Sequence, residues 1–184
     1  MRNTLRRIGY GVLGAGMIVA MTAGASAGAA SAASAAPAVT AAKPAALSWP
    51  TVKRGAAGER VYAVQYLLNY RTTARLHVDG KFGLATQAAV RSFQRKAHLS
   101  ADGVVGNTTW SRLIVTLTKG SRGDAVRAVQ HNLRYAYGHK ILSVDGIFGA
   151  KTLDAVKAFQ KKYRLKADGI VGAATWNTLV RNEK

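Results

Sequence analysis

The sequence predicts an all-α protein: two tandem small three-helix-bundle domains that follow an N-terminal signal peptide and an Ala-rich linker. Two observations support this prediction. The segment that begins near Trp49 is repeated about 66 residues later, and each copy contains three stretches with apolar residues at helical spacing. Because this period exceeds the roughly 20–50 residues of solenoid repeats, each copy should be a separate domain with its own core. The expected domains are residues 48–115 and 116–184.

The internal repeat includes turn residues as well as helix residues. The motif Asp-Gly-x-Phe-Gly at 79–83 returns at 145–149, and Asp-Gly-hydrophobic-Val-Gly at 102–106 returns at 168–172. Before Asp79 the offset between the copies falls by one, so the second copy has gained one loop residue. Gly supplies the positive φ that a tight turn needs, and Asp can accept hydrogen bonds from nearby backbone donors. These motifs are therefore expected to be turns that precede the second and third helices of each copy.

Three helices are expected in each copy. The first has Val and Leu on one face, with Glu59 and Asp124 placed to favour the helix N-terminus. The second is amphipathic, and the third is short, with a Trp and a Leu three positions apart. The expected ranges, for the first and second copies in turn, are 61–68 and 126–133, 86–97 and 152–163, and 107–114 and 173–180.

The first residues have the pattern of an export signal. Arg2, Arg6 and Arg7 precede an uncharged apolar run, and small residues that suit a cleavage site follow it. Residues 1–27 are therefore expected to be a signal peptide, cleaved between 27 and 36, and residues 28–47 an Ala/Ser/Pro-rich linker. A retained membrane anchor is the alternative, but a run that grades into Ala, Ser and Gly fits cleavage better. The expected product is secreted and has no stable membrane insertion.

The chain is strongly basic and has no cysteine. Its 27 Lys and Arg against 8 Asp and Glu give a net charge of +19, which falls to +16 without the three arginines of the signal. Such a charge favours polyanionic partners, among them nucleic acid, anionic lipid and acidic wall polymers, without choosing among them. The absence of cysteine excludes disulfides, thiolate metal sites and a cysteine nucleophile.

The repeated pattern resembles the peptidoglycan-binding domain family, a three-helix type often appended to bacterial cell-wall hydrolases. The resemblance covers essentially all of residues 49–180 and rests on Asp-Gly-x-Phe-Gly, Thr, Ala-Val, Phe-Gln, Asp-Gly-hydrophobic-Val-Gly and Thr-Trp-x-x-Leu, present twice. It implies binding to peptidoglycan, a cell-wall location and no catalysis by the domain itself. The sequence leaves no segment for an enzyme, so the expected protein either acts alone or has a partner wall hydrolase on another chain.

No catalytic residue, cofactor or metal site is expected. The aspartates of the Asp-Gly motifs could form an acid/base pair for glycoside cleavage, but each lies directly before Gly, where the side chain usually serves the backbone. The four histidines lack zinc-ligand spacing and are expected to be solvated. Two alternatives stay open: a small wall hydrolase with an unrecognised site, and a secreted regulator of a wall hydrolase. Nucleic-acid binding is not expected, because no nucleic-acid-binding motif accompanies the charge.

Candidate ligand-binding residues form three groups. The tyrosines of the first helix form an aromatic face that could bind a ligand, complete a core or fill an interface between the copies. The Asp-Gly-x-Phe turns could meet a ligand, although core packing of the Phe is expected first. Basic residues recur on the second helix, where they either attract phosphate-bearing wall polymers or peptide carboxylates or form a solvated face. The candidates are Tyr62, Tyr66, Tyr70, Asp79, Gly80, Phe82, Arg91, Arg95, Asp145, Gly146, Phe148, Lys157 and Lys161.

Overall fold

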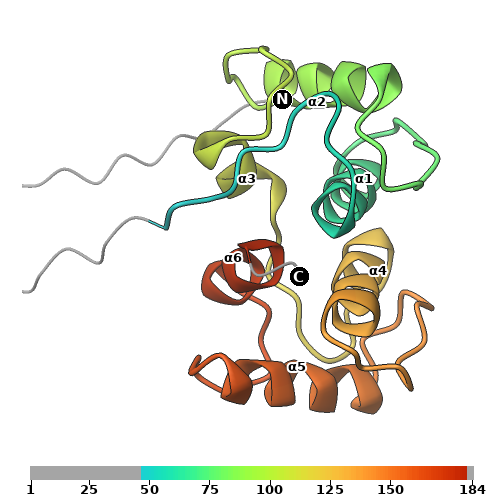
Figure 1. The fold of residues 1–184 in the computed structure, drawn as a ribbon, viewed down its shortest axis with the longest axis vertical. Coiled ribbons are helices and arrows are strands. Elements are labelled where there is room, and N and C mark those ends of the chain that lie inside the picture. Colours follow the sequence, from blue (N-terminus) through green and yellow to red (C-terminus); the bar gives the residue numbers. More distant parts are fainter. Residues whose placement is uncertain (1–46, 182–184) are drawn as a thin grey trace, which may run out of the picture. The chain divides into compact units, whose positions relative to one another are not determined.

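A computed structural model describes residues 47–181 of the chain (Figure 1). These residues belong to one compact unit. The predicted signal peptide, and the predicted linker apart from its last residue, lie outside the described residues. Within 47–181 no helix is long and apolar enough to span a lipid bilayer.

The described residues are all-α, with the predicted three helices in each copy and no strand. In the first copy the helices are α1 (Glu59–Arg71), α2 (Leu84–Lys96) and α3 (Asn107–Leu113). In the second they are α4 (Asp124–His131), which continues into the π-helical turn η1 (Asn132–Ala136), α5 (Ala150–Lys162) and α6 (Ala173–Arg181). Glu59 and Asp124 begin their helices, as predicted, where a negative charge favours the helix dipole.

Equivalent residues of the two copies occupy equivalent positions in the core. Trp110 and Trp176 are fully buried, and each indole N–H donates to a backbone oxygen, Pro50 O at 2.8 Å and Val115 O at 2.7 Å. The Val and Leu face of the first helix is buried in both copies, which confirms the helical spacing read from the sequence. Isolated antiparallel bridges, such as Val52 with Val105, tie each entering segment to a later turn.

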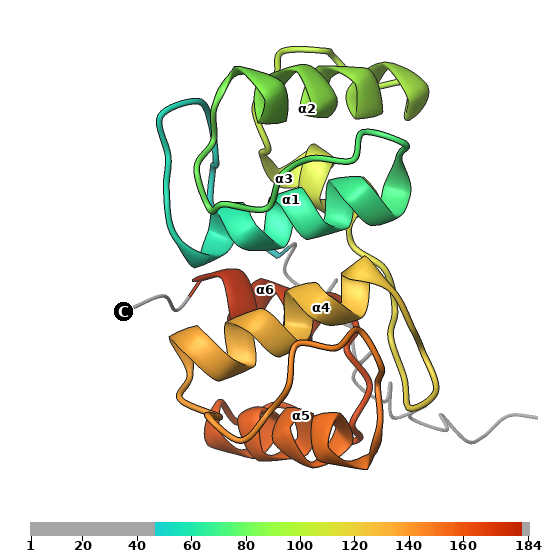
Figure 2. The ribbon, with the colours of Figure 1, turned by 90° about the vertical axis from the view of Figure 1, so that its right-hand side faces the viewer.

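The first helices of the two copies pack against each other and run in opposite directions. His131, at the end of α4, lies 2.8 Å from a carboxylate oxygen of Glu59, at the start of α1, while Tyr70 lies against Gly123 at the other end. Figure 2 shows α1 and α4 side by side, with α2 beyond α1 and α5 beyond α4. The buried apolar residues of both copies form one continuous cluster, so the expectation of two separate cores is wrong.

His131 corrects a second expectation. Its side chain is 12% exposed, rather than solvated, and stacks on Tyr62 with 4.1 Å between ring centroids. The ring centroid of Tyr135 lies 4.5 Å from that of His131. A histidine in this position replaces contacts with water by a contact with the Glu59 carboxylate and by aromatic contacts, which stabilise the packing of α1 on α4.

Candidate functional site

The Asp-Gly turn of the first copy is held by a buried glutamine of α1. The side-chain Nε2 of Gln65 donates to Asp79 Oδ1 at 2.8 Å and to Thr86 Oγ1 at 3.2 Å. Its Oε1 accepts from the backbone N–H of Gly80 at 2.9 Å, and Asp79 Oδ1 also accepts from the N–H of Lys81 at 2.9 Å. Gln65 is 1% exposed, so its amide exchanges contacts with water for a full set of protein hydrogen bonds.

The same network occurs at all four Asp-Gly turns, twice in each copy. In each case a buried Gln amide binds the Asp carboxylate and a Thr hydroxyl, and the Thr follows the Asp by seven positions. The four sets are Gln65, Asp79 and Thr86; Gln94, Asp102 and Thr109; Gln130, Asp145 and Thr152; and Gln160, Asp168 and Thr175. Sequence reasoning noted the repeated Gln and Thr but missed that the Gln is the centre of each turn.

These hydrogen bonds lower the pKa of the turn aspartates. For Asp79 the main cause is the bond from the Gln65 side chain. For Asp102, Asp145 and Asp168 it is the bond from the backbone N–H two residues further on. A general acid for glycoside cleavage needs a raised pKa, so the shifts argue against such a role. They agree with the prediction that these side chains serve the turns.

The other candidates of the Asp-Gly-x-Phe turns face the protein interior. Phe82 and Phe148 are 2% and 1% exposed, so their rings have no free face for a ligand, and we assign them to core packing. Gly80 and Gly146 have φ of 69° and 78°. The ring of Tyr62 lies directly on Gly80, where any Cβ would collide with it, so glycine is required for this close approach.

The tyrosine face of α1 lies mainly between the copies. Tyr62 and Tyr66 are half-buried around His131. The ring centroids of Tyr66 and His131 are 5.9 Å apart, and burial raises the pKa of Tyr66. Tyr70 is 46% exposed at the edge of this interface. Of the three uses left open by the sequence, these positions favour the interface.

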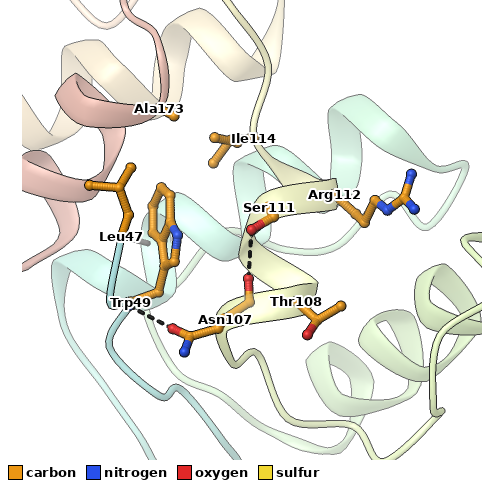
Figure 3. A pocket seen from close by; sticks show the side chains of 8 residues that line it. All are labelled: Leu47, Trp49, Asn107, Thr108, Ser111, Arg112, Ile114 and Ala173. Atoms are coloured by element: carbon orange, nitrogen blue, oxygen red, sulfur yellow. Dashed lines mark hydrogen bonds between the residues drawn. The ribbon is translucent and has the colours of Figure 1, made fainter. Parts of the chain in front are cut away.

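A cavity of about 460 Å³ lies where the entering segment, α3 and the start of α6 meet (Figure 3). Its apolar wall includes Trp49, which stacks on Trp110 with 5.7 Å between ring centroids. Its polar wall is the exposed face of α3, and the backbone N–H of Trp49 donates to Asn107 Oδ1 at 2.7 Å. The lining residues are Leu47, Trp49, Asn107, Thr108, Ser111, Arg112, Ile114 and Ala173.

The family model described as "Putative peptidoglycan binding domain" matches residues 57–113 and 122–179. The chain belongs to the peptidoglycan-binding domain family. The resemblance read from the sequence is thereby confirmed, and each match falls on one of the two copies.

Relatives of the chain include cell-wall enzymes. A Bacillus licheniformis protein named "Probable N-acetylmuramoyl-L-alanine amidase" is 34% identical over 151 residues, which cover 67% of this chain and 43% of the relative. The zinc D-Ala-D-Ala carboxypeptidase of Streptomyces albus G is 40% identical over 105 residues, covering 55% and 40%. A crystal structure of a peptidoglycan-binding protein from Clostridioides difficile, in complex with glutamine hydroxamate, is 39% identical and covers 35% of this chain and 40% of that one, with a TM-score of 0.34. The chain thus spans less than half the length of these relatives.

The two peptidoglycan-binding domains differ at the junction cavity. The polar α3 positions Asn107 and Thr108 correspond to Ala173 and Ala174 of α6, and Trp49 corresponds to Ile114. Sequence reasoning missed this cavity because it looked for what the copies share.

The basic candidates lie on the second helix of each peptidoglycan-binding domain. Arg91 and Arg95 of α2 are exposed and border a pocket of about 360 Å³. On α5, Lys161 is exposed and Lys157 is half-buried. Among the described residues no group of three or more His, Asp and Glu is placed to hold a metal ion.

Proposed function

We propose that this is a secreted, non-catalytic cell-wall protein that binds peptidoglycan through two tandem domains. The main support is that both family matches coincide with complete folded copies, each with both of its Gln-centred turns formed. The four turn aspartates have lowered pKa values and are engaged by backbone and Gln donors, which supports a binding rather than a hydrolytic role.

The junction cavity is the contact we propose for the wall ligand. Its apolar side, with the exposed Leu47 beside the largely buried Trp49, suits the carbon face of a sugar or a peptide side chain, and the hydroxyl and amide groups of α3 suit polar substituents. Arg112 at the rim could attract a peptide carboxylate. Residues from both domains line this cavity, so the tandem arrangement itself contributes to the proposed site.

The packing of α1 on α4 changes how two binding domains would cooperate. Domains on a flexible tether gain affinity through effective concentration. Here the Glu59–His131 pair and the bonds from Arg60 to Val180 O and Arg181 O, at 2.6 and 3.0 Å, join the domains directly. An isolated copy would expose the faces of Tyr62 and Tyr66. Variants within the tandem protein are therefore a cleaner test than separated copies.

Co-sedimentation with purified insoluble peptidoglycan tests the proposal. Protein comprising residues 36–184 is mixed with wall stripped of its anionic polymers, across a salt series. Pelleting that persists at high salt is expected, because a shaped site is screened less than a charged surface. Loss of pelleting at moderate salt would mean that charge alone holds the protein to the wall and would overturn the proposal.

Two further measurements locate the site and test for catalysis. Thr108→Tyr places a large side chain in the junction cavity and should weaken pelleting about 10-fold, whereas Ala174→Tyr, at the equivalent exposed position of α6, should leave it unchanged. Equal effects of the two variants would exclude the cavity as the site.

Dye-labelled wall should release no soluble dye, and release would favour the alternative of a small hydrolase.

A further inference from the structure

Most acidic side chains of the described residues make a hydrogen bond or an ionic contact within the protein. The four turn aspartates accept hydrogen bonds from buried glutamines. Glu59 pairs with His131, and Asp124 with Arg127 at 2.8 Å. Asp154, on α5, is exposed and makes no such contact. The 27 Lys and Arg of the chain outnumber its 8 Asp and Glu, and this excess of positive charge favours a polyanionic ligand.

Two arginines of α2 stand out on this surface. Arg91 and Arg95 are one helical turn apart, and both are exposed. They border a pocket of about 360 Å³ together with Leu84, Gln87 and Ala88. Leu84 is 70% exposed, so two cationic groups lie next to apolar surface on the same face.

Packing helps to position one of these guanidinium groups. Arg91 lies across Gly103, close enough that a Cβ at this glycine would stand 2.9 Å from Arg91 Nε. On the same turn, Asp102 Oδ1 already accepts from Gln94 at 2.7 Å and from the N–H of Val104 at 2.9 Å. Arg91 thus lies along the turn, where its positive charge also helps to lower the pKa of Asp102.

The second domain has a different charge pattern at the same place. Lys157 and Lys161 replace the two arginines, and Asp154 replaces Ala88 one turn before Lys157. The carboxylate reduces the local positive potential, and lysine lacks the two-pronged geometry of guanidinium. Any ligand that needs two adjacent arginines would therefore select the first domain.

We propose that the α2 face formed by Leu84, Gln87, Ala88, Arg91 and Arg95 binds the phosphodiester groups of a polyol-phosphate polymer of the cell wall. Guanidinium binds phosphate oxygens through two parallel hydrogen bonds. A single exposed ion pair contributes little, which makes a lone carboxylate a weak ligand, but a chain with regularly repeated phosphates can engage both arginines at once. The apolar surface of Leu84 and Ala88 suits the carbon atoms between the phosphates. The face has no aromatic side chain on which nucleic-acid bases could stack, which disfavours a single-stranded nucleic acid.

Fluorescence anisotropy with labelled poly(glycerol phosphate) tests this site, using protein of residues 36–184. R91Q/R95Q should weaken binding about 10-fold, while K157Q/K161Q, which removes the same charge, should weaken it about 2-fold. Exchanging the residues at this equivalent position between the domains adds a second test of the local charge. A88D should weaken binding about 3-fold, and D154A should strengthen it about 2-fold. Both positions are exposed, so the folded core is preserved in each variant.

Equal losses for the arginine and lysine pairs would overturn the proposal, because they would show binding by net charge alone. It would also fall if DNA, or vesicles of phosphatidylglycerol, bound as tightly as the polymer with the same dependence on Arg91 and Arg95. Pelleting of R91Q/R95Q with stripped peptidoglycan should match that of the unchanged protein. This control separates the phosphate site from the proposed peptidoglycan site, whose failure would leave the anisotropy result standing.

Discussion

In the first domain Arg71 closes the end of α3, donating from Nε to Leu113 O at 3.0 Å and from Nη2 to Ile114 O at 2.6 Å. In the second domain Tyr137 does the equivalent work at the end of α6, donating its hydroxyl to Leu179 O at 2.8 Å. Both side chains bind carbonyl groups that the end of a helix leaves without partners, but one is an arginine and the other a tyrosine. The Gln-centred turns and buried tryptophans, by contrast, are the same residue types in both domains. The interior is thus duplicated closely, while the helix ends and surfaces have diverged.

The largest expected effect tests whether the cores of the two domains unfold together. Trp176→Ala removes a fully buried side chain and should lower the free energy of unfolding by about 3–5 kcal/mol. Because α1 packs on α4, both domains should still unfold in one urea transition, followed by circular dichroism. Trp110→Ala should behave alike, and Leu84→Ala, at an exposed position, should change stability by less than about 0.5 kcal/mol. Two well-separated transitions would contradict this prediction and show that the domains unfold independently.

A smaller effect is expected from the centre of one turn. Gln130→Leu leaves the backbone N–H of Gly146 and the hydroxyl of Thr152 without their amide partner, which should cost about 2–3 kcal/mol in urea unfolding. Gln94→Leu should cost a similar amount in the first domain, since its network is equivalent. Gln87→Leu is the matched control, because Leu153 occupies that position in the second domain. A cost no larger than that of the control would contradict the structural role given to these glutamines.

The fold was predictable because helical spacing and turn motifs are local signals. The helices, the Asp-Gly turns and the burial of Phe82 and Phe148 follow from residues close in sequence. The role of Gln65 was missed because glutamine is usually exposed, and only the fold shows that its amide reaches a turn 14 residues away. Apolar spacing also does not say whether a face meets its own domain or a neighbouring one, and so the α1–α4 interface was left open.

The junction cavity and the arginine face depend on differences between the copies. Thr108 against Ala174 and Ala88 against Asp154 are single substitutions on exposed helix positions, which have little effect on folding. An internal repeat is recognised by its matching residues, so positions that differ between the copies do not contribute to its recognition. Where two domains share an interior, their unequal surface residues are the better guide to unequal ligands.

The smallest effect concerns a polar group inside the second domain. Asn132 is fully buried at the start of the π-helical turn, and its Nδ2 donates to Ala128 O at 3.0 Å while Oδ1 has no partner among the described residues. The equivalent residue of the first domain is Leu67, which is also fully buried, within a regular α-helix. Asn132→Leu should therefore raise the free energy of unfolding by about 1 kcal/mol in urea, because it removes an unsatisfied buried acceptor.

The reverse exchange supplies the control. Leu67→Asn places the same amide in the first domain and should destabilise by about 2–3 kcal/mol, because a buried apolar contact is lost and a polar group is desolvated. If Asn132→Leu instead destabilised the protein, the amide would be required by the π-helical turn itself. If it stabilised the protein but weakened pelleting with stripped peptidoglycan, the π-helical turn would be retained for binding, since π-helical turns often occur at functional sites. Stabilisation with unchanged pelleting would place the difference between Leu67 and Asn132 among the changes that leave binding unaffected.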